Sequence, residues 1–412
     1  MLLLSLFLAC SSTKITKSLS KTLGSPFFNS HFTGMYFYDI SANKVVYNYN
    51  GDKYFTPASN AKIFTLFTGL TLLNDSIPAF KYEVNKDTLT ILSTGDPTFL
   101  HNYFNDSTAL KMAEKFSKVQ LILNNIEDKR YGPGWAWEDF DTYFSAERSA
   151  FPMYGNVVTI QNKDSVLIVP SYYQNKIKMT NNFGREEFSN KFFFRKDRTV
   201  MTEIPMIIDS ILIANLWSHL LPNKVFIREG AKKKPTRVAY SVPSDSLFKR
   251  MMVESDNFLA EQVLVLASST LSDTLSSARV RTYMLENELK DLKQQPRWVD
   301  GSGLSRYNLF SPKSFVEVLT KLYVSIPQPR LFNFFPVGGK SGTVKNWYAG
   351  KDIPYLFAKT GTVGNNYNVS GYLLTNSGKV LVFSYMSNHY RKSTNQIRTQ
   401  MQKTFEWLRD TY

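Results

Sequence analysis

The stretch that decides the fold is Pro57-Ala58-Ser59-Asn60-Ala61-Lys62, which continues as an apolar run to Leu73. Apolar residues recur in this run at helical spacing, and the proline stands where helices commonly begin. Ser59 and Lys62 are three positions apart, so a helix places hydroxyl and amine on one face. A neutral lysine there can take the serine proton, and backbone N–H groups at the helix start favour an oxyanion. The stretch predicts a buried helix that begins with a nucleophile and its base.

Two further motifs follow in order. Ser255-Asp256-Asn257 offers a hydroxyl and an amide at a loop or helix junction. Lys359-Thr360-Gly361-Thr362 ends the apolar strand of residues 355–359. Its glycine lets a substrate lie along the strand edge, and its lysine supplies fixed positive charge. The similar stretch Lys340-Ser341-Gly342-Thr343 follows a loop instead of a strand, so it is the second candidate for this motif.

These three motifs together carry a family resemblance, because Ser-x-x-Lys, Ser-Asp-Asn and Lys-Thr-Gly in this order mark penicillin-binding proteins and class A β-lactamases. The chain resembles the D-alanyl-D-alanine carboxypeptidase/endopeptidase family of low-molecular-mass penicillin-binding proteins, in the class C branch with a large insertion after the Ser-x-x-Lys helix. The similarity runs from about Gly34 to the C-terminus and includes residues 95–98, 132–137, 300–306 and 335–339.

The resemblance implies an α/β (α+β) fold: a penicillin-binding, serine β-lactamase-like transpeptidase domain with an antiparallel sheet flanked by helices, plus an inserted β-rich domain. It implies a serine-type D-Ala-D-Ala carboxypeptidase, with a D,D-endopeptidase reaction as a second expectation. The substrates would be peptidoglycan stem peptides, β-lactams would be covalent inhibitors, and no cofactor or metal would be needed.

Five catalytic roles follow from the resemblance. Ser59 is the nucleophile, and Lys62 is its base. Ser255 relays a proton to the leaving amine, Asn257 holds the substrate amide and orients Lys62, and Lys359 adds positive potential. Burial and the like charge of Lys359 would both lower the pKa of Lys62 toward working pH.

Substrate binding is expected along the last motif. By resemblance, Thr360 and Thr362 bind the terminal carboxylate through their hydroxyl groups, beside Gly361. The backbone N–H groups of Ser59 and Thr362 would form the oxyanion hole.

Secondary-structure patterns indicate one sheet built from both ends of the chain. Residues 35–49 predict a β-hairpin, residues 355–359, 368–375 and 379–386 predict strands, and residues 395–410 predict a closing amphipathic helix. Further helices are expected at 108–119, 207–221, 243–267, 277–292 and 314–324, and short strands within 82–241. The expected domains are a leader and tether (1–21), a peptidase domain (22–80 and 243–412) and an inserted domain (81–242).

The net charge of the chain and its first residues indicate which partners and which cellular compartment to expect. The 412 residues include 49 Lys and Arg against 34 Asp and Glu, a formal net charge of +15, which favours polyanionic partners. The basic residues are scattered, so nucleic acid is not expected. Cys10, the only cysteine, follows an apolar run and precedes Ser11 and Ser12. This start predicts export to the periplasm or cell envelope and lipidation at Cys10, the only expected tie to a membrane; an incidental cysteine in a signal peptide is the alternative.

Other functions were weighed against this interpretation. A serine β-lactamase of the same fold needs a deacylating base that the sequence does not reveal, and a non-catalytic envelope-binding protein is the other alternative. The four histidines lie in no triad or metal motif, and Ser302 in Asp300-Gly-Ser-Gly303 is interpreted as a turn residue.

Overall fold

The computed structural model describes residues 14–412 except 164, 223, 230–233 and 352. Cys10 therefore lies outside the described residues. The chain forms two compact units, which are described separately: unit 1 takes in residues up to Phe67, Phe248–Ser255 and Tyr283–Tyr412, and unit 2 takes in Thr68–Leu247 and Asp256–Thr282. The stretch 81–242, expected to be an inserted domain, lies within unit 2.

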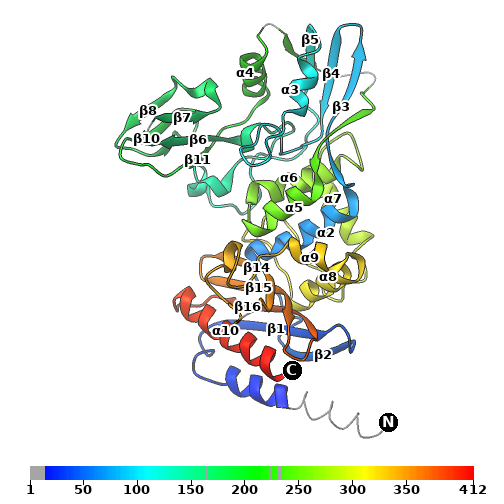
Figure 1. Cartoon of the computed structure of the whole chain (residues 1–412), viewed down its shortest axis with the longest axis vertical. Helices are drawn as coiled ribbons and strands as arrows, with labels where there is room; N and C mark the ends of the chain where they lie inside the picture. The colour runs from blue at the N-terminus through cyan, green and yellow to red at the C-terminus, as the bar shows by residue number, and fades with distance from the viewer. Residues whose placement is uncertain (1–13, 164, 223, 230–233, 352) are drawn as a thin grey trace. The chain divides into compact units, whose positions relative to one another are not determined.

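Unit 1 is built on a five-stranded antiparallel sheet in the order β14-β15-β16-β1-β2. The strands are β1 (Phe32–Asp39), β2 (Lys44–Tyr49), β14 (Leu356–Val363), β15 (Asn366–Leu374) and β16 (Val380–Asn388). The hairpin from the start of the chain pairs with the last strand through β1 and β16, as Figure 1 shows in blue beside orange. The prediction of one sheet that combines strands from both ends of the chain is confirmed.

Helices cover both faces of this sheet because its side chains alternate between two buried sides. On one face, α10 (Thr394–Thr411) and the helical residues 14–23 share a core with Val369 and Leu373 of β15. On the other face lies α8 (Pro312–Ser325), whose Leu319 carbonyl accepts a hydrogen bond from the Tyr372 hydroxyl. The even-numbered side chains of β15, such as Tyr372, thus point toward the face that α8 covers.

Three shorter helical segments complete this framework. The one-turn 3-10 helix η1 (Ala58–Ala61) leads directly into α2 (Lys62–Leu72), in which Phe64 packs edge-on against Phe310 and Phe315. Helix α9 (Gln328–Asn333) stacks Phe332 on Phe357 of β14.

The described residues of unit 2 form three sheets. The largest has the order β12-β5-β4-β3-β13 and mixes parallel and antiparallel pairs, and two three-stranded sheets have the orders β11-β6-β7 and β8-β10-β9. Its strands are β3 (Ser76–Asn85), β4 (Thr88–Ser93), β5 (Lys118–Ile122), β6 (Val157–Asn162), β7 (Val166–Val169), β8 (Ile177–Thr180), β9 (Gly184–Arg185), β10 (Phe192–Arg195), β11 (Thr202–Pro205), β12 (Val225–Ile227) and β13 (Arg237–Pro243). The remaining helices are α3 (Thr108–Ala113), α4 (Ser210–Leu220), α5 (Ser244–Val253), α6 (Asn257–Ser268) and α7 (Ser277–Glu286).

Several element boundaries differ from the prediction, and four of the differences change how the site is built or where strands and helices begin and end. The helix expected at 108–119 ends at Ala113, because Val119 pairs with β4 as part of strand β5. The helix expected at 243–267 is broken between α5 and α6, where Ser255 has a φ of +61° and Asp256 caps α6. The helix expected at 277–292 is shorter, since α7 ends at Glu286. The strand expected to end at Lys359 continues to Val363.

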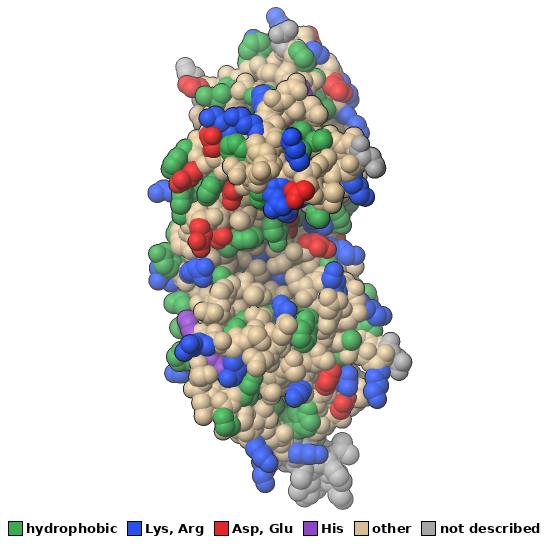
Figure 2. Space-filling model, turned by 90° about the vertical axis from the view of Figure 1, so that its left-hand side faces the viewer, with side chains coloured by type: hydrophobic (Ala, Val, Ile, Leu, Met, Phe, Trp, Pro, Cys, Tyr) green, Lys and Arg blue, Asp and Glu red, His purple; other side chains and the backbone are tan. Residues whose placement is uncertain are grey.

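The surface carries charge of both signs. On the face shown in Figure 2, Lys and Arg side chains are dispersed among acidic and uncharged ones. Within the described part of the chain, no helix is long and apolar enough to cross a membrane.

Candidate active site

Ser59 and Lys62 meet at the junction of η1 and α2. The Nζ atom of Lys62 lies 3.0 Å from the Ser59 Oγ and donates a second hydrogen bond to the Ser302 carbonyl at 2.7 Å. Lys62 is fully buried, whereas Ser59 is half-buried. The serine lies in a 3-10 turn rather than in the α-helix, because Ala58 before it has a φ of +47°. The expected contact between hydroxyl and amine is present in unit 1.

The Ser302 carbonyl is held in place by a buried carboxylate. Asp300 accepts hydrogen bonds from the backbone N–H groups of Gly303 at 2.9 Å and Ser305 at 2.6 Å, which fixes the loop between them. Gly303 has a φ of +82°, and a Cβ there would collide with the Ala58 carbonyl. Only glycine is therefore accommodated where this loop meets η1. Ser302 contributes its backbone to the site, a role that its side-chain pattern did not indicate.

Lys359 of β14 is the second buried lysine of unit 1. Its Nζ donates to the Ser255 Oγ at 2.8 Å and to the Thr360 carbonyl at 2.8 Å. Burial lowers the pKa of Lys359 well below its ordinary value, and the nearby Lys62 lowers it further. The charge of Lys359 is therefore not fixed, in contrast to the sequence-based expectation, because burial and a like charge both oppose its protonation.

Gly361 brings β14 against the nucleophile turn. A Cβ at this position would collide with the Pro57 carbonyl and would lie 3.0 Å from the Ser59 backbone nitrogen. Thr362, the next residue, is exposed, whereas Thr360 is buried. The edge of β14 thus runs beside Ser59 with Thr360 and Thr362 on either side of the glycine.

Thr343 contacts Thr360, and sequence reasoning gave it no role in the site. The Thr360 hydroxyl donates to the Thr343 Oγ1 at 2.6 Å. Thr343 belongs to the second-ranked Lys-Ser-Gly-Thr motif, which forms the short helix η6 (Gly342–Val344) instead of a strand. Its similarity to the Lys-Thr-Gly motif was the only signal in the sequence that pointed to it.

Asn257 is placed in unit 2, as the first residue of α6. Its side-chain Nδ2 donates to the Phe144 carbonyl at 3.0 Å, in the same unit. Asp256 caps the helix by accepting a hydrogen bond from the Leu259 N–H at 3.0 Å, which sets the start of α6 directly after Ser255.

No group of three or more His, Cys, Asp or Glu side chains in the described ranges could hold a metal ion. The groups gathered around Ser59 in unit 1 are hydroxyl, amine and backbone groups. A serine in hydrogen-bond contact with a buried lysine, beside the edge strand of an antiparallel sheet, is the arrangement of the serine acyl-transfer enzymes of the penicillin-binding class.

Comparison with known proteins identifies the family. The model of the D-Ala-D-Ala carboxypeptidase 3 (S13) family matches residues 15–186 and 220–409, so the chain belongs to this family. It is a serine-type D-Ala-D-Ala carboxypeptidase, a hydrolase.

Individual relatives agree over nearly the whole chain. The D-alanyl-D-alanine carboxypeptidase DacB of Haemophilus influenzae is 22% identical over 91% of this chain and 89% of its own length. The crystal structure of penicillin-binding protein 4 from Haemophilus influenzae aligns with a TM-score of 0.73 at 20% identity, covering 93% of this chain and 97% of the other. A structure of that protein complexed with a β-lactam aligns with a TM-score of 0.63 at 18% identity, covering 91% and 95%. These similarities confirm the predicted penicillin-binding fold.

Proposed function

We propose that this carboxypeptidase removes the terminal D-alanine from peptidoglycan stem peptides through an acyl-enzyme on Ser59. The observation that carries the proposal is the 3.0 Å contact between the Ser59 Oγ and the Nζ of the fully buried Lys62. A buried amine close to a second amine is readily neutral, and a neutral amine can accept the serine proton.

Acylation begins when Lys62 takes the Ser59 proton and the Oγ attacks the carbonyl carbon of the penultimate D-alanine. The resulting oxyanion is stabilised by the backbone N–H groups of Ser59 and Thr362. The C–N bond then breaks, and Ser255 gives its hydroxyl proton to the leaving nitrogen. Ser255 regains a proton from Lys359, whose Nζ donates to its Oγ at 2.8 Å.

The lysine pair keeps the same number of protons during this step. Lys62 begins neutral and ends charged, whereas Lys359 begins charged and ends neutral. Deacylation reverses the exchange: a water molecule attacks the ester, its proton returns through Ser255 to Lys359, and Lys62 protonates the departing Ser59 Oγ. The two lysines are thus proposed to share one proton at working pH, and the lowered pKa of Lys359 favours release of its proton to Ser255 during acylation.

Substrate recognition is proposed for the motif around Gly361. Its lack of a Cβ lets the peptide lie along the edge of β14, and the hydroxyl groups of Thr360 and Thr362 donate to the terminal carboxylate. Lys359 adds positive potential for that carboxylate, and Asn257 holds the substrate amide. The cross-links of peptidoglycan contain the same kind of D,D amide, so the endopeptidase reaction is proposed for the same residues and is tested with a cross-linked dimeric muropeptide.

Membership of this family of cell-wall enzymes implies an exported or envelope location. Within that location we propose the periplasm and a lipid anchor at Cys10, from the sequence around that residue. Replacement of Cys10 by Ser should release the protein from the membrane fraction, and unchanged fractionation would contradict the anchor.

The test of the proposed function is an intact-mass time course with excess benzylpenicillin on the wild type and on Ser59→Ala. A lasting adduct on the wild type alone, together with D-alanine release from a pentapeptide, supports the peptidase. Drug consumption without a lasting adduct would instead indicate a β-lactamase. Neither adduct nor consumption would indicate a binding protein.

A further inference from the structure

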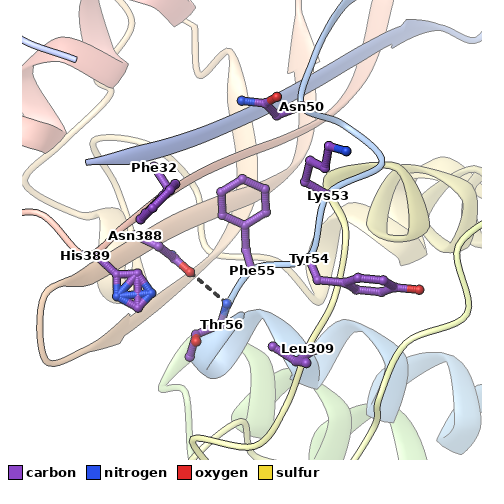
Figure 3. A pocket seen from close by; sticks show the side chains of 9 residues that line it. All are labelled: Phe32, Asn50, Lys53, Tyr54, Phe55, Thr56, Leu309, Asn388 and His389. Carbon is purple, nitrogen blue, oxygen red and sulfur yellow. Dashed lines mark hydrogen bonds between the residues drawn. The ribbon is translucent and has the colours of Figure 1, made fainter. Parts of the chain in front are cut away.

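Two buried asparagines lie behind the turn that carries Ser59. Asn388, at the end of β16, accepts a hydrogen bond from the Thr56 backbone N–H at 2.7 Å, and Figure 3 shows this contact in the wall of a cavity of about 610 Å³. The Asn388 Nδ2 donates to the Asn368 Oδ1 at 3.0 Å. The Asn368 Nδ2 in turn donates to the carbonyls of Thr56 at 3.0 Å and Pro57 at 2.9 Å. The backbone just before the nucleophile is therefore held by a chain of two amides.

The same strand also holds the residue that follows Ser59. The Asn60 Nδ2 donates to the Ser370 Oγ at 2.8 Å, and Ser370 donates to the Ser384 Oγ at 2.8 Å. Asn368 and Ser370 are two positions apart on β15, so their side chains project from the same face of the sheet. Strand β15 thus holds the turn on both sides of the nucleophile.

The turn needs such support because it is strained. Ala58 is 1% exposed and has a φ of +47°, a conformation that costs a residue with a Cβ about 1 kcal/mol or more. Strain of this kind persists only where the surroundings fix it. The conformation of Ala58 sets the direction of the Ser59 N–H, which is one of the two donors in the proposed oxyanion hole.

The chemistry of the two positions favours amides. Asn388 uses its oxygen as an acceptor and its nitrogen as a donor, and Asn368 does the same, so each side chain serves a donor and an acceptor at once. Both residues are at most 1% exposed, so water cannot readily replace their hydrogen bonds. Carboxylates would present only acceptors, and apolar side chains would leave buried carbonyls unpaired.

We propose that Asn368 and Asn388 are positioning residues for acyl transfer, which hold the Pro57–Ser59 backbone so that the Ser59 N–H faces the developing oxyanion. The inference rests on the proposed function, since it concerns the same nucleophile. It adds a role for β15 and β16 that neither the motifs nor the contacts of Ser59 and Lys62 contain. Because neither asparagine contacts the lysines in the hydrogen bonds described, the pair acts on geometry and not on protonation.

The test is the acylation of Asn368→Ala and Asn388→Ala by benzylpenicillin, with the limiting rate and the half-saturating concentration measured separately at several pH values. Asn368→Ala should lower the limiting rate roughly 30- to 100-fold, because small displacements of reacting groups cost about that much. The half-saturating concentration and the pH midpoint should stay near those of the wild type. Asn388→Ala should have a smaller effect, roughly 5-fold, since it loses one backbone contact whereas Asn368→Ala loses two.

Asn125 provides a matched control in unit 2. Its Nδ2 donates to the carbonyls of Ser93 and Asp273, both at 2.9 Å, and it is 7% exposed, so Asn125→Ala loses the same kind of contacts in the unit that does not carry the nucleophile. It should lower the melting temperature by a similar amount and leave the limiting acylation rate of the folded protein unchanged.

Three results would overturn the inference. The first is an Asn368→Ala protein that acylates at the wild-type rate. The second is a loss of acylation rate in Asn368→Ala that is explained by its unfolded fraction, or that is no larger than the loss in Asn125→Ala. If Asn368→Ala does not fold, Asn388→Ala decides, and a wild-type rate there counts against the pair. Failure of the proposed function is distinguishable, because the wild type itself would then form no adduct.

Discussion

The two units bury charge in opposite ways. Unit 1 buries two basic side chains, Lys62 and Lys359, both fully inaccessible to solvent, whose Nζ atoms donate to hydroxyl and carbonyl oxygens. Unit 2 buries an opposite pair, in which Arg148 and Glu261 lie 2.7 Å apart. An opposite pair is satisfied in the folded state and changes little in a reaction, whereas a like pair is satisfied only when one member is neutral. This difference distinguishes the lysine pair, which is proposed to exchange protons during catalysis, from the Arg148–Glu261 ion pair, which stabilises the fold.

Lys62→Met should have the largest effect on acylation. It removes the proposed base while keeping an apolar side chain of similar length, so acylation by benzylpenicillin should fall roughly 10³-fold. The melting temperature should change little, because the resting Lys62 is proposed to be neutral and its removal takes away no buried charge. Intact-mass kinetics and calorimetry measure the two effects. A variant that acylates normally, or that unfolds while losing activity, would show that Lys62 is a structural residue.

Arg148→Met makes the converse change in unit 2. It removes the ion-pair partner of the buried Glu261 carboxylate, so the free energy of unfolding should fall by about 3 kcal/mol or more. The acylation rate of the remaining folded protein should change little. Denaturant unfolding followed by acylation at low temperature checks both parts. A large loss of acylation at unchanged stability would remove the distinction between the two buried pairs.

The buried carboxyl group of Asp96 should make the stability of unit 2 depend on pH. Burial raises its pKa to about 7, while hydrogen bonds from the Ser241 hydroxyl and the Thr98 N–H oppose that rise. The folded state therefore binds more protons than the unfolded state between about pH 4 and pH 7, so the stability of unit 2 should fall as pH rises through this range, by about 4 kcal/mol at most. Asp96→Asn should flatten this dependence in thermal melts. An equal slope in wild type and variant would exclude Asp96 as its source.

Thr343→Val is the smallest change and concerns the site of unit 1. It removes the acceptor of the Thr360 hydroxyl while keeping the shape of the side chain. We expect kcat/KM for a D-Ala-D-Ala peptide to fall about fivefold, the equivalent of ~1 kcal/mol. Thr320→Val, on α8, is the control, since its hydroxyl donates only within its own helix, to the Val316 carbonyl. If the two substitutions lower kcat/KM equally, Thr343 has no specific role in the site.

The sequence predicts those parts of the fold that local pattern determines. The hairpin of β1 and β2 and the strands β14 to β16 were predictable because long apolar runs with turn residues between them specify strands. The contact between Ser59 and Lys62 was predictable because spacing on a helical segment fixes it. The boundaries of the expected domains stay a prediction.

The rest depends on tertiary contacts. The Ser302 carbonyl reaches Lys62 through a backbone atom, which no residue type reveals. Asn368 and Asn388 act across strands, where an asparagine in an apolar run has no distinctive spacing. The lowered pKa of Lys359 depends on burial, so a pattern that predicts a positive charge at that position could not predict how weakly the charge is held.

The central claim is that the two buried lysines share one proton, which leaves Lys62 neutral beside Ser59. The most direct measurement is the limiting rate of acylation by benzylpenicillin across pH. We expect a bell-shaped profile: the rate rises as the lysine pair loses its first proton, at a pH well below the ordinary lysine value near 10.5, and falls when the pair loses its second proton. A rate that rises only near pH 10.5, or that does not change with pH, would contradict it.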